Sequence, residues 1–206
     1  TMKLLFTTTG HPGHVLPLVP LARACLRAGH EVRVAGPRSR GEVVRQAGLP
    51  FWAFDDPPAG EVDAVFAPTA GLPPEEANAV VIGEVFGRLA AGAALPGVLA
   101  MIEAWRPDVV VRESYEFASA VAAERGGVPH VRVATGLRST EDWLLGHAPA
   151  VVPAEAIRAS PLISLTPPGF DDGPVTHRFR AGAQRARSDE RFVYVTFGSV
   201  AGGMPI

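Results

Sequence analysis

The chain has 206 residues, of which 47% are hydrophobic and 19% are charged, and its formal net charge is -2 at pH 7. This balance gives no basic excess to attract nucleic acid or an anionic membrane, and we expect neither as a partner. The single cysteine, Cys25, excludes a disulfide framework and a cysteine metal cluster. We find neither an apolar run of membrane-spanning length nor a signal-peptide pattern, which favours a cytoplasmic enzyme.

The chain begins with an apolar run that passes through a Gly/His/Pro turn into a helical pattern. Residues 2–6 predict a buried strand, and the turn places His11, Gly13 and His14 at the carboxyl end of that strand. Helical spacing follows, with Leu26 among the residues predicted on its apolar side.

Strand and helix patterns then alternate along the chain. The further predicted strands are residues 31–35, 50–54, 108–112, 130–134 and 160–165. The predicted helices between them are residues 39–47, 75–105, 115–125, 140–145 and 154–158. Pro96 divides or bends the longest of these helices, and Ser114 caps the one that begins at residue 115. Residues 55–74 are rich in Pro, Gly and Asp and predict a long loop.

This alternation predicts an α/β fold with a doubly wound parallel sheet, because parallel neighbours need crossover connections. We expect a Rossmann-like domain over residues 2–165. Residues 166–190 contain Pro, Gly and Arg without apolar periodicity, which predicts an interdomain linker. In residues 191–206 an apolar strand runs into a glycine-rich turn, which we interpret as the start of a second Rossmann-like domain that is mostly absent from this sequence.

Two residues lie where such a sheet binds its ligand, at the carboxyl ends of strands. His14 follows the first predicted strand and Glu113 follows the fourth. Neighbouring strands are about 4.8 Å apart, so the carboxylate can reach the imidazole. A histidine with a pKa of about 6.5 can then take a proton from a hydroxyl group, while the carboxylate fixes its tautomer. The residues alone leave alternatives open: His14 as a polar loop residue, Glu113 as an exposed charge, and His11 as the base.

The glycine-containing turns separate the nucleotide-binding classes. The first turn does not fit G-x-G-x-x-G and the chain has no P-loop motif, so a dehydrogenase is a poor fit. The turn that contains Gly198 and Ser199 offers a hydroxyl group and backbone N–H groups to a phosphate.

Three stretches together carry a resemblance: GHPGHVLPLVPLARACLRAGHEV, RPDVVVRESYEFASAVAAERGGVPHV and VYVTFGS. The chain resembles family 1 glycosyltransferases of the GT-B fold, specifically the bacterial enzymes that decorate antibiotics and other natural products. The resemblance implies that His14 is the general base and that Glu113, where the family commonly has Asp, is its acidic partner. It also implies that Gly13, Gly198 and Ser199 bind the nucleotide-sugar donor.

The resemblance implies an inverting transfer of a sugar from a nucleotide-sugar donor to a hydroxyl group of a bulky, apolar aglycone. Neither a metal nor another cofactor is expected, because helix N-termini and hydroxyl groups can hold a pyrophosphate. Aromatic and apolar residues near the crevice suit a flat aglycone. The residues predicted to bind the acceptor are His11, Phe66, Phe86, Trp143 and Leu144. A non-catalytic small-molecule-binding or partner protein on the same fold is the alternative, and a homodimer is left open.

Overall fold

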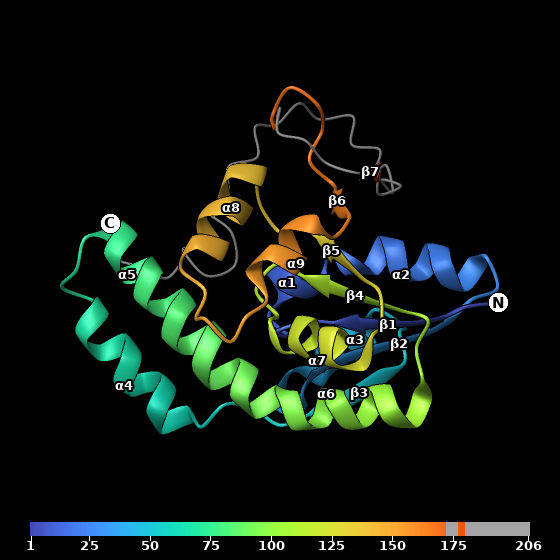
Figure 1. Cartoon of the computed structure of the whole chain (residues 1–206), viewed down its shortest axis with the longest axis horizontal. Coiled ribbons are helices and arrows are strands. Elements are labelled where there is room, and N and C mark those ends of the chain that lie inside the picture. The colour runs from blue at the N-terminus through green and yellow to red at the C-terminus, as the bar shows by residue number, and fades with distance from the viewer. Residues whose placement is uncertain (172–176, 180–206) are drawn as a thin grey trace, which may run out of the picture.

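The computed structural model describes residues 1–171 and 177–179, and a parallel sheet forms its centre (Figure 1). The strands are β1 (Lys3–Thr7), β2 (Glu31–Pro37), β3 (Phe51–Phe54), β4 (Val109–Glu113), β5 (His130–Val133), β6 (Leu162–Ser164) and β7 (His177–Arg178). Their order in the sheet is β3-β2-β1-β4-β5-β6-β7, and every neighbouring pair is parallel. The predicted α/β fold with a parallel sheet is confirmed. β1 and β4 are neighbours, with Thr7 opposite Arg112, so their carboxyl ends lie side by side.

Helices cover both faces of this sheet. They are α1 (Pro12–Val15), α2 (Leu18–Arg27), η1 (Arg38–Arg40), α3 (Gly41–Gln46), α4 (Ala59–Thr69), α5 (Pro74–Val80), η2 (Val81–Ala90), α6 (Ala91–Trp105), α7 (Ala118–Gly126), α8 (Arg138–Gly146) and α9 (Ala154–Ala159). α5, η2 and α6 form one continuous helix, of which η2 is a π-helical part. Pro96 lies inside α6 and does not divide this long helix in two.

The side chains of β1 show how the sheet separates two layers of core. Leu5 belongs to a buried cluster with residues of α6, α7 and α9, whereas Leu4 and Phe6 belong to a cluster with residues of α1, α2 and α3. Successive side chains of a strand face opposite sides of the sheet, so a strand covered on both sides is apolar throughout. The near-continuous apolar strands of the sequence have this origin.

The predicted loop over residues 55–74 is wrong, because α4 occupies most of it. Glu61 lies in the first turn of α4, where a negative charge favours the helix, and Pro68 lies near its end. Val62 and Phe66 are four residues apart and therefore share one face of the helix. α4 also packs against η2. Such tertiary contacts stabilise a helix whose Pro and Gly content locally indicates a loop.

Three smaller predictions also differ from the structure. α7 begins at Ala118 rather than at residue 115, and the hydroxyl of Ser114 bonds to Glu141 of α8 instead of capping α7. Leu26 was predicted on the apolar side of the first helix, but it is exposed. The buried residues of α2 all lie in its first half. β7 pairs with β6, so a short strand lies within the predicted linker. The domain boundaries themselves stay predictions.

The helix Pro74–Trp105 is long and apolar enough, by length and composition, to cross a membrane, although the sequence was expected to contain no apolar run of that length. Its residues Val98, Met101 and Trp105 are buried in the core cluster of one sheet face, and α6 packs against α7. Core helices pass the same test of length and composition, so this finding gives only weak support for a membrane span.

Arg33 of β2 contacts two tryptophan rings, one of which belongs to Trp105, the last residue of the long helix. Its guanidinium carbon is 4.6 Å from the ring centroid of Trp52 in β3 and 4.7 Å from that of Trp105 in α6. A cation over an aromatic face is attracted by the ring electrons. The contact therefore attaches the end of α6 to the sheet.

Candidate active site

His14 and Glu113 form a hydrogen-bonded pair at the carboxyl end of the sheet. His14 lies in α1, which follows β1, and Glu113 is the last residue of β4. The distance between His14 Nδ1 and Glu113 Oε2 is 2.9 Å. The His14 side chain is 19% exposed, whereas that of Glu113 is fully buried. The contact expected from the strand order is thus present, and Glu113 is not an exposed charge.

The two groups stabilise each other's charged forms. Burial raises the pKa of Glu113, but the charge and hydrogen bond of His14 and the N–H groups of Tyr115 and Thr9 lower it below its usual value overall. Burial lowers the pKa of His14, but the charge and hydrogen bond of Glu113 raise it above its usual value overall. Glu113 is therefore a carboxylate near neutral pH, so Nδ1 of neutral His14 is the donor and its Nε2 carries the lone pair. This nitrogen can accept a proton.

Backbone groups from two loops hold the Glu113 carboxylate. The Thr9 N–H donates to Oε1 at 3.0 Å and the Tyr115 N–H donates to Oε2 at 2.8 Å. The first loop turns at Gly10, whose φ is +89°, and a β-carbon there would overlap the β-carbon of Arg40. A glycine at this position therefore allows the chain to pass from β1 into α1 with Thr9 aimed at the carboxylate.

The second loop is held by Arg112, which is fully buried in β4. Its Nη1 donates to the backbone oxygen of Glu113 at 2.9 Å, of Ser114 at 3.2 Å and of Glu116 at 3.3 Å. These bonds satisfy backbone oxygens at the end of β4 and in the turn that follows it. The turn directs the Tyr115 N–H at Glu113 and delays the start of α7.

Aromatic rings pack against His14. The ring centroid of Tyr115 is 4.9 Å from that of His14, with the ring planes at 87°, and that of Phe86 is 6.0 Å away. The Tyr115 and Phe86 rings are themselves 5.0 Å apart. His11 lies farther off, 6.5 Å from His14. The imidazole of the pair is thus packed among other rings rather than surrounded by water.

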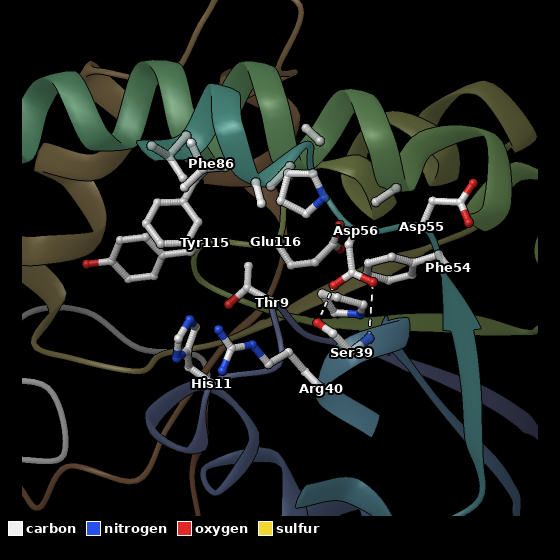
Figure 2. A pocket seen from close by; sticks show the side chains of 18 of the residues that line it. Thr9, His11, Ser39, Arg40, Phe54, Asp55, Asp56, Phe86, Tyr115 and Glu116 are labelled. Atoms are coloured by element: carbon white, nitrogen blue, oxygen red, sulfur yellow. Dashed lines mark hydrogen bonds between the residues drawn. The ribbon is translucent and has the colours of Figure 1, made fainter. Parts of the chain in front are cut away.

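A cavity of about 460 Å³ lies beside the pair, between the carboxyl ends of the strands, α4 and the long helix. Figure 2 shows Phe86 and Tyr115 side by side above His11 and Arg40, with Ser39 and Asp56 joined by hydrogen bonds at the far side. The apolar part of its wall includes Pro37, Phe54, Pro57, Ala59, Val62, Phe66, Val85, Phe86, Ala90, Ala91, Ala94 and Phe117. Its volume is within the range of small-molecule sites.

Three of the five predicted acceptor residues, His11, Phe66 and Phe86, line this cavity. Leu144 does not, and its prediction is wrong, because it is fully buried in the core cluster over one sheet face. Trp143 is not part of the cavity wall either, and it packs partly buried against the same cluster. α8 therefore turns this part of its apolar side toward the sheet and not toward the cavity.

The structure gives little information on the three residues predicted to bind the donor. Gly198 and Ser199 lie outside the described residues, so their roles stay predictions. Gly13 is exposed in α1, and a β-carbon there would meet nothing within 4 Å. Within residues 1–171 and 177–179, no group of three or more His, Cys, Asp or Glu side chains could hold a metal ion. The expectation of metal-free chemistry stays a prediction.

Several residues of the site were not anticipated from the sequence, among them Thr9, Arg40, Arg112, Tyr115 and Glu116. Thr9 and Tyr115 hold Glu113 through backbone N–H groups, for which side-chain patterns give no signal. Glu116 lines the cavity, yet its carboxylate also accepts the N–H of Ser119 at the start of α7. Burial raises the pKa of Glu116. The side chain of Tyr115 gave the one usable signal among them, because an aromatic residue two positions after the predicted acid is a candidate for the cavity wall.

Comparison with known proteins identifies the family. Residues 23–159 match the family described as "Erythromycin biosynthesis protein CIII-like, N-terminal domain". The chain belongs to this family. It is 39% identical over 142 residues to an L-demethylnoviosyl transferase from Streptomyces niveus, covering 66% of this chain and 35% of that protein. It is 29% identical over 154 residues to a tylactone mycaminosyltransferase from Streptomyces fradiae, covering 66% of this chain and 34% of that protein.

Solved structures agree with this assignment. The glycosyltransferase SsfS6 of Streptomyces sp. SF2575 matches with a TM-score of 0.68 and 26% identity, over 92% of this chain and 57% of that chain. SnogD from Streptomyces nogalater matches with a TM-score of 0.59 and 29% identity, over 82% of this chain and 46% of that chain. Both are GT-B glycosyltransferases, so the predicted fold family is confirmed. The chain spans about a third of the length of the curated relatives it matches.

Proposed function

We propose that the protein transfers a sugar from a nucleotide-sugar donor to a hydroxyl group of a bulky, apolar natural-product aglycone, with inversion at the anomeric carbon. The observation that carries this proposal is the His14–Glu113 pair beside an apolar cavity. The names of the relatives support sugar transfer. SsfS6 forms a complex with thymidine diphosphate, which supports a nucleoside diphosphate as the leaving group.

In the proposed reaction, Nε2 of neutral His14 accepts the proton of the acceptor hydroxyl. The hydroxyl oxygen forms a bond to the anomeric carbon while the bond from that carbon to the pyrophosphate oxygen breaks. The nucleoside diphosphate leaves with the electron pair, and attack from the opposite side inverts the carbon. Glu113 stabilises the imidazolium that forms and keeps its ring oriented. The step needs no metal ion and no redox cofactor.

His14 is a better base than His11 for an electrostatic reason. Burial and the nearby charges of Arg40 and His14 lower the pKa of His11, so its protonated form is disfavoured. His14 instead has a buried carboxylate as a hydrogen-bond partner, which favours the form that the reaction produces. We therefore propose that His11 contacts the acceptor and that His14 takes the proton.

The wall of the cavity supports an apolar acceptor. Phe66 of α4 and Phe86 of η2 contribute aromatic surface, and each such ring can bury ~150–250 Å² against a ligand. Val62 and Val85 extend the apolar wall on the same two elements. A flat or macrocyclic aglycone therefore fits this wall better than a small hydrophilic acceptor.

The test is turnover by the full-length protein with a thymidine-diphosphate sugar and a panel of aromatic and macrocyclic aglycones. We expect His14→Ala to lower kcat by ~10²–10⁴-fold with little change in the acceptor KM, which is the usual effect of losing a general base. His30→Ala is the matched control, because His30 precedes β2 at the opposite end of the sheet and its side chain accepts the Met2 N–H, far from the His14–Glu113 pair.

Near-normal turnover of His14→Ala would exclude His14 as the base. Tight binding of apolar ligands without sugar transfer by the wild-type protein would instead favour the non-catalytic binding protein. Transfer with retention at the anomeric carbon would exclude direct displacement.

A further inference from the structure

Tyr115 contacts both members of the His14–Glu113 pair. Its backbone N–H donates to Glu113 Oε2 at 2.8 Å, and the same oxygen accepts His14 Nδ1 at 2.9 Å. Its ring meets the His14 ring almost at right angles, with 4.9 Å between centroids. One residue therefore fixes the carboxylate through its backbone and borders the imidazole through its side chain.

Phe86 supports the Tyr115 ring from the long helix. The two ring centroids are 5.0 Å apart, and Phe86 is also 6.0 Å from His14. Phe86 lies in η2, a π-helical segment, and such segments occur frequently at functional sites. The three rings come from α1, η2 and the loop after β4, and they form one contiguous cluster.

The Tyr115 and Phe86 rings lie between His14 and the acceptor cavity. Tyr115 and Phe86 are part of the cavity wall. His14 is not among the residues that line the cavity, and its ring packs against these two rings. An acceptor in the cavity therefore presents its hydroxyl to His14 past the edge of the Phe86 and Tyr115 rings.

We propose that Tyr115, backed by Phe86, is a positioning residue that holds the His14 imidazole with Nδ1 on Glu113 and thereby keeps Nε2 available to the acceptor hydroxyl. The proposal rests on the proposed function for its catalytic consequence, but the orientation of the ring does not depend on turnover. Edge-to-face packing restricts rotation of the imidazole about its bond to the side chain. A free imidazole ring can otherwise place either nitrogen toward the carboxylate.

The first test measures the ring orientation directly. In protein with ¹⁵N-labelled histidine, at a pH where His14 is neutral, we expect nitrogen shifts typical of a single Nδ1–H tautomer. Tyr115→Leu removes the ring but keeps the backbone N–H to Glu113, and it should give averaged shifts from mixed tautomers. Tyr115→Phe keeps the ring and should retain the wild-type pattern. Phe66→Leu is the matched control, because Phe66 lines the same cavity from α4.

The second test separates kcat from KM in the full-length protein. We expect Tyr115→Leu to lower kcat by about tenfold or more at an unchanged donor KM, Tyr115→Phe to restore it to within about twofold, and Phe66→Leu to change chiefly the acceptor KM. A single Nδ1–H tautomer in a folded Tyr115→Leu variant would overturn the proposal. So would a Tyr115→Phe variant as impaired as Tyr115→Leu, which would assign the effect to the hydroxyl. If the wild-type protein shows no transfer but the tautomer results hold, the proposed function fails and the positioning role stands.

Discussion

Glu113→Gln removes one buried charge from the site with little change in volume, and its effect can be worked out from the three donors that Glu113 accepts. The N–H groups of Thr9 and Tyr115 and Nδ1 of His14 all point at its oxygens. A glutamine has a single acceptor oxygen, so its NH₂ group would face at least one of these donors. Hydrogen bonds to charged groups contribute about 1.5–3 kcal/mol.

The substitution removes stabilisation mainly from the transition state, because the imidazolium that Glu113 stabilises in the proposed reaction forms only as the proton is transferred. Two unit charges ~4 Å apart attract by about 4 kcal/mol at an effective dielectric constant of about 20, and the partial exposure of His14 reduces this value. A net loss of about 2–3 kcal/mol corresponds to a kcat about 30- to 150-fold lower. The acceptor KM should change little, since Glu113 is fully buried behind His14.

The assay is the pH dependence of kcat for the wild type and Glu113→Gln. Activity of the wild type should fall as the pH decreases through the raised pKa of His14, because the protonated imidazole is no base. The carboxylate of Glu113 is what raises the pKa of His14, and without it burial, which lowers the pKa, remains, so this acidic limb should move to lower pH. Glu124→Gln, which removes a carboxylate that bonds to His130 elsewhere, is the control. A Glu113→Gln variant with an unshifted acidic limb would refute the assigned role of Glu113.

The remaining predictions concern stability. Gly10→Ala should lower the free energy of unfolding by about 1–3 kcal/mol, because φ at this position is +89° and the new β-carbon would overlap Arg40. Gly13→Ala is the control and should leave the free energy of unfolding nearly unchanged, because its β-carbon would meet nothing within 4 Å. Urea denaturation of both variants measures the difference. Arg33→Leu should lower it by about 1–3 kcal/mol through loss of two cation–π contacts, and Arg33→Lys should recover part of the loss in the same assay. The raised pKa of His14 stabilises the fold below about pH 6.5, and this contribution disappears as the pH rises through the pKa of the folded state. The difference in the free energy of unfolding between the wild type and His14→Gln should therefore decrease from about pH 6 to about pH 9. No decrease would contradict the raised pKa.

The sheet and the His14–Glu113 contact were predictable because their signals are local or follow from topology. The strands β1 to β6 were predicted from apolar runs that need cover on both faces, whereas β7 has no such run. The order that places β1 beside β4 follows from the doubly wound arrangement, and it brings the residues after these two strands together. His14 and Glu113 therefore meet for the same reason that the sheet forms.

The fixation of Glu113 was not predictable from side-chain patterns. Thr9 and Tyr115 act through backbone N–H groups, and their direction depends on turns. One turn requires the positive φ of Gly10, and the other is held by the guanidinium of Arg112 inside the sheet. Arg112 interrupts an otherwise apolar strand, and the sequence pattern gave no reason for a buried cation there.

The cavity wall was the hardest part to predict, because it depends on how α4 and η2 pack on each other rather than on either segment alone. A spacing of 3.6 residues places Val81, Val85 and Leu89 on the buried side of the long helix. The structure buries Ile82, Val85 and Leu89, so Val85 and Leu89 agree with this spacing and Ile82 is buried in place of Val81. Phe86 follows the buried Val85, and its contact with Tyr115 joins η2 to the loop after β4, a tertiary contact that no apolar period predicts. In the proposed reaction, the groups that move the proton lie at the ends of two neighbouring strands, whereas the wall of the acceptor cavity depends on the packing of α4 against η2. A substitution on α4 can therefore change the cavity wall while the His14–Glu113 pair stays in place.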